Sequence, residues 1–135
     1  MKIVGIIYPI PSFLVNRIKK NKEFIFVKNP THESLPKYID RGDKILFYCK
    51  KEIIAEATIN AIHLQYLQDI LKLKNVLQTR EELEDYSSLN SKKFKKQIVF
   101  ELSKIKDYNF LKCPFYITMT GRYITSKDYK DIINQ

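Results

Sequence analysis

Hydrophobic and polar residues alternate over short stretches of this chain, which is the pattern of β-strands separated by turns. Residues 41–44 form a Gly-Asp turn ahead of the apolar run 45–49, and a second run, 53–59, follows the charged turn 50–52. The two runs predict a hairpin. In the second run isoleucines and alanines share one face, which suits the cramped interior of a small curled barrel: Ile53, Ala55, Ala57 and Ile59.

The rest of the pattern predicts a mixture of strands and helices. Further strands are expected at 3–8, 24–28, 98–103 and 115–119, with turns at 108–110 and 120–123. The strand 3–8 is almost entirely apolar, so we expect it inside the sheet. Apolar spacing and capping residues predict helices that begin at Ser12, span 34–41, span 63–77, begin at Thr79, and begin at Thr125 or Ser126.

Length and composition indicate one folded domain, residues 1–135. The chain has 135 residues, of which 44% are hydrophobic, and this suffices for a single core. No apolar run approaches the roughly 20 residues of a membrane helix, so we expect no membrane partner. The apolar start ends at Pro9 and Pro11 without a small-residue cleavage site. We therefore interpret it as a strand rather than a signal peptide, and expect a cytoplasmic protein.

Several kinds of site have no support in the sequence. Three glycines, none adjacent to another, allow neither a phosphate-binding loop nor a dinucleotide fingerprint, so we expect no nucleotide cofactor. The candidate metal ligands are His32, Cys49, His63 and Cys113, and they show no C-x-x-C or H-x3-H spacing. We therefore expect no bound metal, and we expect both cysteines to be reduced thiols.

The charge of the chain is strongly basic and unevenly placed. The net charge is +9, and basic residues gather at 17–28 and 92–96, whereas acidic residues gather at 81–85. Segregated charge favours a basic face that attracts polyanions, and we expect RNA or another single-stranded nucleic acid as the partner. An evenly lysine-rich surface is the other interpretation.

Residues 24–29, Phe-Ile-Phe-Val-Lys-Asn, resemble the strand beside the base pocket of YTH and EVE domains. Those domains belong, with the PUA and ASCH domains, to the PUA-like superfamily, which other stretches of the chain also resemble. In residues 21–28, Lys22 matches the lysine of the ASCH signature Gly-x-Lys-x-x-Glu-x-Arg, and Lys28 lies one place beyond its arginine. The turn 41–44 with Ala55-Glu56-Ala57 and the tail 118–125 are similar to an uncharacterised archaeal family of this superfamily. The resemblance covers mainly residues 1–60 and 98–106.

This resemblance implies an α+β fold, a small PUA-like mixed or antiparallel β pseudo-barrel surrounded by short helices. It also implies a module that binds RNA or holds a single, often modified, base in a pocket beside the barrel. Lysines and an arginine are candidates for phosphate contacts: Lys19, Lys20, Lys22, Lys28 and Arg122. Residues that offer a ring, an amide, an imidazole or a hydroxyl are candidates for base contacts: Tyr8, Asn29, Thr31, His32, Thr120 and Tyr123. A solvated loop and a helix-capping turn are the plainer interpretations of residues 28–33 and 120–125.

Two other functions remain open at this stage. The ASCH resemblance also implies an amidohydrolase acting on a modified nucleoside, with Lys22 activated by Lys19 and Lys20, and Glu33 or Glu56 as its acid-base partner. Glu56 faces away from the alanines, so we expect it to be exposed or paired with a lysine. A scaffold subunit whose basic face docks on an acidic protein is the third possibility.

Overall fold

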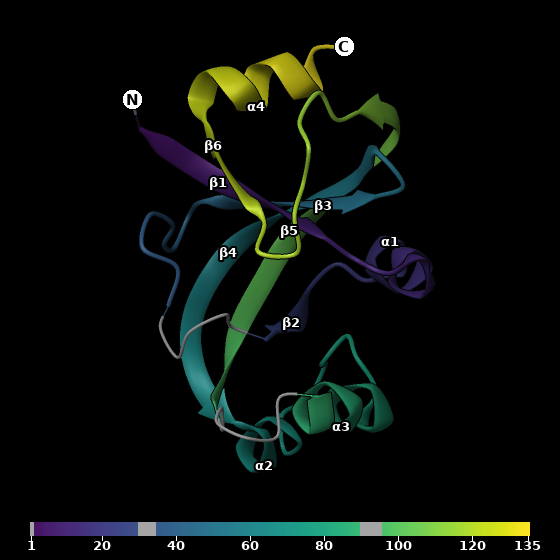
Figure 1. The fold of residues 1–135 in the computed structure, drawn as a ribbon, viewed down its shortest axis with the longest axis vertical. Coiled ribbons are helices and arrows are strands. Elements are labelled where there is room, and N and C mark those ends of the chain that lie inside the picture. Colours follow the sequence, from purple (N-terminus) through teal and green to yellow (C-terminus); the bar gives the residue numbers. More distant parts are fainter. Residues whose placement is uncertain (1, 30–34, 90–95) are drawn as a thin grey trace.

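The structure is a computed structural model, which describes residues 2–29, 35–89 and 96–135. In these residues six strands form one strongly curved, open mixed sheet of order β2-β5-β4-β3-β1-β6 (Figure 1). The strands are β1 (Ile3–Pro9), β2 (Phe24–Lys28), β3 (Lys44–Cys49), β4 (Glu52–Tyr66), β5 (Lys96–Lys112) and β6 (Arg122–Thr125). The helices are η1 (Ser12–Leu14), α1 (Val15–Lys20), α2 (Leu67–Ile70), α3 (Arg80–Leu89) and α4 (Ser126–Ile133). The predicted α+β fold is confirmed.

The predicted hairpin and the interior position of the first strand are also confirmed. β1 lies between β3, to which it is parallel, and β6, to which it is antiparallel. β3 and β4 pair as a hairpin whose turn residues Lys50 and Lys51 have φ values of 51° and 69°. This left-handed backbone matches the right-handed twist of the flanking strands, so the turn can be tight.

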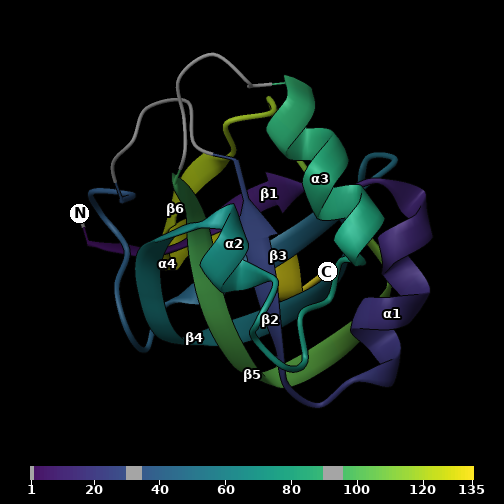
Figure 2. The same cartoon turned by 90° about the horizontal axis from the view of Figure 1, so that it is seen from below.

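The sheet is buried on both faces because its strands alternate between separate cores. Tyr8 packs with Phe26, Phe47 and Phe100 on one face, next to α1. The adjacent residue of β1, Ile7, packs on the other face in the core beneath α4. A smaller core lies where α2 and α3 cover β2 and β5 (Figure 2): Val27, Ile70, Leu83 and Val99.

Four local predictions are wrong. Residues 35–41 contain no helix, β5 runs through the predicted turn at 108–110, and 115–119 contain no strand. β4 extends to Tyr66, so the predicted helix 63–77 is reduced to α2, Leu67–Ile70. In 62–66 the two-residue period prevails, because Ile62 and Leu64 pack against the core while β5 pairs alongside.

Helix capping is predicted correctly at two of three places. Thr79 precedes α3, and its hydroxyl accepts a bond from the Glu82 N–H at 3.3 Å. Thr125 precedes α4 and forms a capping box with Asp128. Ser12 lies inside η1 rather than capping it, and no side chain caps that helix. No helix among the described residues is long and apolar enough to cross a membrane.

Candidate functional site

Three of the predicted phosphate-binding lysines line one hollow, which we call the basic groove. It has a volume of about 540 Å³ and lies where the end of α1 meets the middle of β5. α1 ends at Lys20, and the Asn21 amide donates back to the Arg17 carbonyl oxygen at 2.7 Å. On the β5 side Lys104 has a φ of 52°, which marks an irregularity in the strand. The lining residues are Lys19, Lys20, Asn21, Lys22, Lys104, Ile105 and Asp107.

The groove gathers four ammonium groups against one carboxylate. Among the described residues, none of these lysines lies within salt-bridge distance of an acidic side chain. Lys19 Nζ donates to the Tyr108 carbonyl oxygen at 3.3 Å, a neutral partner. Arg17 differs, because it donates to both carboxylate oxygens of Glu82, at 2.7 and 3.2 Å. That bond lowers the pKa of Glu82 and ties α1 to α3, so Arg17 serves the fold.

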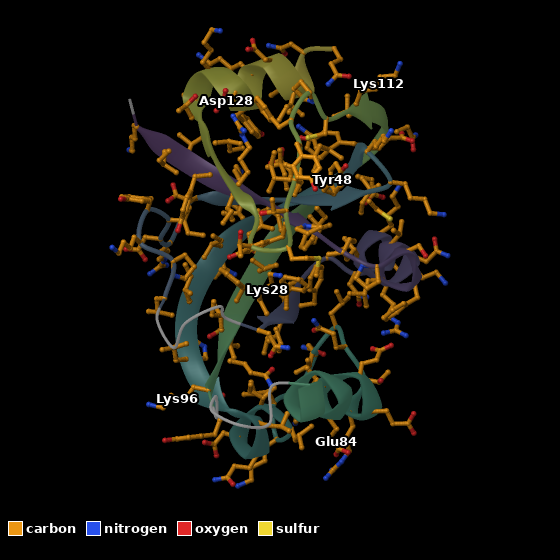
Figure 3. The ribbon with its side chains drawn as sticks, in the orientation of Figure 1. Lys28, Tyr48, Glu84, Lys96, Lys112 and Asp128 are labelled. Atoms are coloured by element: carbon orange, nitrogen blue, oxygen red, sulfur yellow. The ribbon has the colours of Figure 1, made fainter. Side chains whose placement is uncertain are left out.

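A second group of predicted residues meets at the other end of β2. Lys28, the last residue of β2, places its Nζ 5.2 Å from the centre of the Tyr8 ring and donates to the Met119 carbonyl oxygen at 2.8 Å. Burial lowers the pKa of Lys28. Figure 3 shows Lys28 near the middle of the molecule, whereas Lys96 and Lys112 lie at its periphery. We call Tyr8, Lys28, Met119, Gly121 and Tyr123 the Lys28 site.

The Lys28 site is held by close packing. Gly121 lies against Tyr8, and a Cβ at Gly121 would come within 2.7 Å of the Tyr8 ring. Tyr8 is only 3% exposed, and burial raises its pKa, with Tyr123 as the next cause. The Tyr123 hydroxyl accepts a bond from the Lys37 N–H at 3.1 Å, and its ring meets Tyr38 edge-on at 5.1 Å. The segment 35–38 is thereby fastened to β6.

Of the other predicted residues, Arg122 lies on the opposite face of the sheet from the Lys28 site. Arg122 pairs with Ile7, so its side chain lies on the α4 face, over the Phe115 ring at 4.0 Å. Tyr123 pairs with Ile6 and lies on the opposite face. Thr120 is exposed and shares a hydrogen bond with Thr118 at 2.9 Å. Asn29 is half-buried directly after Lys28, and Thr31 and His32 lie outside the described residues.

Sequence reasoning missed two exposed side chains beside the Lys28 site. Tyr38 is 61% exposed and Met119 is 74% exposed, whereas the Tyr8 ring is covered. A ligand can therefore reach Tyr38 and Met119 but cannot stack on Tyr8. Tyr38 could have been noticed as an aromatic residue in a largely polar segment, but the predicted helix at 34–41 drew attention to Leu35 and Ile39 instead.

Glu56 is buried, which corrects the expectation of an exposed carboxylate, although the expected lysine partner is present. Glu56 is 3% exposed, accepts bonds from the Tyr108 and Tyr129 hydroxyls, and lies 3.5 Å from Lys44 Nζ. It pairs with Leu46 and so belongs to the α4 face. Ile105 of the basic groove packs on the other face. The fold therefore does not bring Lys22 and Glu56 together, and Glu33 lies outside the described residues.

No metal-binding group is formed by the His, Cys, Asp and Glu side chains that the structure describes. Cys49 and Cys113 are free thiols. His63 instead bonds to Glu101 at 3.1 Å and to the Gln65 amide at 2.9 Å. These contacts lie on the paired strands β4 and β5, away from both cysteines.

Comparison with known proteins identifies a family and a fold. Residues 3–126 match the model of a family described as a domain of unknown function, DUF365. No curated protein sequence matches the chain. The crystal structure of ASCH from Zymomonas mobilis is similar, with a TM-score of 0.72, 12% identity, and coverage of 97% of this chain and 94% of that one. A tyrosine-to-phenylalanine mutant of that protein gives a TM-score of 0.71 and is covered over 97% of its length. A serine-to-alanine mutant gives 0.73 and is covered over 95% of its length. Both are 12% identical to this chain and match 97% of it. This likeness shows an ASCH-type, PUA-like fold.

Proposed function

The chain belongs to the DUF365 family, whose model spans most of it, and on that premise we propose that it binds single-stranded RNA through the basic groove. The observation that carries this proposal is the gathering of Lys19, Lys20, Lys22 and Lys104 around one hollow. A PUA-like fold is compatible with such a role. The proposal keeps three of the phosphate contacts predicted from the sequence, Lys19, Lys20 and Lys22. Lys28 lies outside the groove, and Arg122 lies on the opposite face of the sheet.

The electrostatics of the groove favour a phosphate backbone as its occupant. Each lysine that neutralises a phosphate releases condensed counterions, and this release supplies much of the affinity for nucleic acid. A lysine already paired with a carboxylate would first have to break that pair. The groove lysines have no such pair among the described residues, so their charges are available.

The shape of the groove favours a single strand over a duplex. A hollow of about 540 Å³ between a helix end and one strand is the size of a small-molecule site. It can hold a phosphate and its sugar, whereas a duplex presents two rigid backbones to a long surface. Proteins that bind single strands combine a positive groove with aromatic side chains, and Tyr38, which meets the Tyr123 ring of the Lys28 site, is exposed.

The test is fluorescence anisotropy with single-stranded RNA, duplex RNA and duplex DNA at two salt concentrations. We expect the single-stranded RNA to bind most tightly. The double substitution Lys20→Ala and Lys104→Ala should weaken it and reduce the slope of log K against log salt by about 0.7 per lysine. The control is Lys72→Ala with Lys130→Ala, which removes the same charge from exposed positions near α2 and on α4.

Two results would contradict the proposal. The first is an equal loss of affinity in both double variants, which would mean that RNA responds to net charge alone. The second is equally weak binding of all three nucleic acids that disappears at the higher salt concentration. An intact fold in both variants, checked by urea unfolding, makes the comparison valid.

A further inference from the structure

We propose that the Lys28 site recognises a nucleobase that carries a ring carbonyl, such as uracil or guanine, through a hydrogen bond from Lys28 Nζ to the carbonyl oxygen. This inference rests on the proposed binding of single-stranded RNA and names the chemistry that selects a base. It extends the role of Lys28 from a phosphate contact, as the sequence suggested, to a base contact.

The first argument concerns the hydrogen bonds of Lys28. An ammonium group has three donors and no acceptor. Among the described residues the Met119 carbonyl oxygen accepts one of them, at 2.8 Å, and the face of the Tyr8 ring lies 5.2 Å away. Burial has removed part of the water that would serve the other donors, and the pKa of Lys28 is lowered accordingly. A ligand with an acceptor oxygen would replace the hydrogen bonds to water that Lys28 lost on burial.

The second argument separates a base from a phosphate. The exposed groups beside Lys28 are the Met119 side chain and, beyond Tyr123, the Tyr38 ring. A thioether and a phenol ring pack well against the flat face of a base. They offer little to the charged oxygens of a phosphate, which prefer several donors. The basic groove has those donors, so we expect the phosphates of an oligonucleotide to bind there and a base to bind at the Lys28 site.

The third argument concerns rigidity, because recognition of one atom needs a fixed donor. Gly121 lets the turn before β6 approach Tyr8 closely, and this approach places the Met119 carbonyl that holds Lys28. The hydrogen bond from the Lys37 N–H to the Tyr123 hydroxyl fixes the segment next to Tyr38 against β6. Lys28 thus donates from a defined position, and an amino group at the same place on adenine would set donor against donor.

The test compares hexauridylate with hexa-adenylate by anisotropy or calorimetry. The wild-type protein should bind hexauridylate at least about fivefold more tightly, the lower end of a specific base contact. Lys28→Met keeps the length of the side chain but removes the donors, so it should abolish this preference. The matched control, Lys22→Met in the basic groove, should weaken both oligonucleotides equally and keep the preference.

A competition with the wild-type protein avoids any effect of substitution on folding. Inosine carries a carbonyl where adenosine carries an amino group, and the two nucleosides otherwise differ only by the hydrogen on N1 of inosine. We expect inosine to displace a labelled oligouridylate more effectively than adenosine does. Inorganic phosphate at the same ionic strength should show no difference between the wild type and Lys22→Met in how much oligouridylate it displaces.

The outcomes distinguish this inference from the function on which it rests. Tight binding of RNA without a uracil or inosine preference would overturn the base assignment and leave the groove proposal standing. An equal loss for both hexamers in Lys28→Met would also overturn it, because Lys28 would then act as a charge. Failure of every oligonucleotide to bind would overturn the proposed function itself.

Discussion

Gly42 and Gly121 both have positive φ, at 93° and 85°, but their surroundings differ. A Cβ at Gly121 would lie 2.7 Å from the Ile7 carbonyl oxygen and 2.7 Å from the Tyr8 ring, whereas nothing lies within 4 Å at Gly42. We predict that Gly121→Ala lowers the free energy of unfolding by about 2–4 kcal/mol, from overpacking added to backbone strain. Gly42→Ala, which adds strain alone, should cost about 1 kcal/mol. Urea unfolding of both variants measures the difference, and equal costs would mean that the turn at Gly121 moves away from Tyr8.

The buried carboxylate of Glu56 leads to a second prediction at this scale. The Tyr129 hydroxyl donates to Glu56 at 2.6 Å and thereby joins α4 to the sheet. Tyr129→Phe removes a hydrogen bond to a charged acceptor, so we expect a loss of about 1.5–3 kcal/mol in the free energy of unfolding. Tyr116→Phe is the matched control, because Tyr116 is 86% exposed and should cost almost nothing.

The same bond predicts a dependence on alkaline pH. Burial, and then the hydrogen bond to Glu56, raises the pKa of Tyr129 to about 12 from a usual value of 10.0. The unfolded chain loses this proton first as the pH rises, so the stabilisation is complete below pH 10 and declines toward pH 12. Urea unfolding at several pH values should show a flatter alkaline decline for Tyr129→Phe than for Tyr116→Phe. Identical pH profiles would show that the Tyr129 proton is not held by Glu56.

Two of the candidate binding residues chosen from the sequence also lie together in the structure. Lys28 and Tyr8 stand at the ends of predicted strands, and the structure brings them together. The burial of Glu56 could not be foreseen, because its partners Tyr108 and Tyr129 are 52 and 73 residues away. An alternation pattern tells which face of the strand a side chain takes but not what covers that face.

At the scale of elements, β2 is an edge strand whose free side is covered by the segment 75–78. Ile25 donates to the Asn75 carbonyl oxygen at 2.8 Å and accepts from the Leu77 N–H at 2.8 Å. The Gln78 side chain then continues this pairing, because its amide accepts from the Val27 N–H at 3.2 Å and donates to the Val27 carbonyl oxygen at 2.7 Å. A side chain here completes the edge of a sheet, which limits pairing with other molecules.

This edge leads to a further prediction. Gln78→Leu keeps the side-chain size but leaves both backbone groups of Val27 without a partner, since Gln78 is only 5% exposed. We expect a loss of about 2–4 kcal/mol in the free energy of unfolding, together with faster aggregation. Gln68→Leu, at an exposed position of α2, is the control and should stay within about 0.5 kcal/mol of the wild type. A Gln78→Leu protein as stable as this control would show that water replaces the amide.

The elements that the sequence predicted correctly are those with local signals. The hairpin turn at Lys50 and Lys51, and the caps at Thr79 and Thr125, depend on neighbours in the chain. The missed stretches depend on distant partners: residues 62–66 of β4 pair with 96–100 of β5, which lie 30 to 38 residues further along the chain. Leu64, Leu67 and Leu71 fit a helical spacing as well, and only that pairing decides between the two periods.

At the scale of the whole molecule, the excess of positive charge is divided rather than spread over one face. In the sequence, residues 17–28 form one basic cluster. In the structure, Arg17 forms an ion pair with Glu82, and lysines 19, 20 and 22 line the basic groove. Lys28 lies at the opposite end of β2, where it bonds to the Met119 carbonyl oxygen. Lys104 joins the groove from a separate strand. Clustering along the sequence therefore showed where basic residues are dense but not how they are arranged in space, which follows from the pairing of β2 with β5.

The separation of the basic groove from the Lys28 site sets a length for the ligand. Lys22 and Lys28 are six residues apart in the sequence, so their Cα atoms are at most about 20 Å apart at about 3.3 Å per residue. A strand of one or two nucleotides can occupy one site, and a strand of roughly four or more, the lower limit of known single-strand sites, can occupy both. We predict that the affinity of oligouridylates rises steeply between two and six nucleotides and then levels off. Calorimetry with oligouridylates of two, four, six and eight nucleotides measures this, with Lys28→Met expected to remove the steep rise. A gradual increase that continues with every added nucleotide would instead mean that the two sites do not hold the same strand.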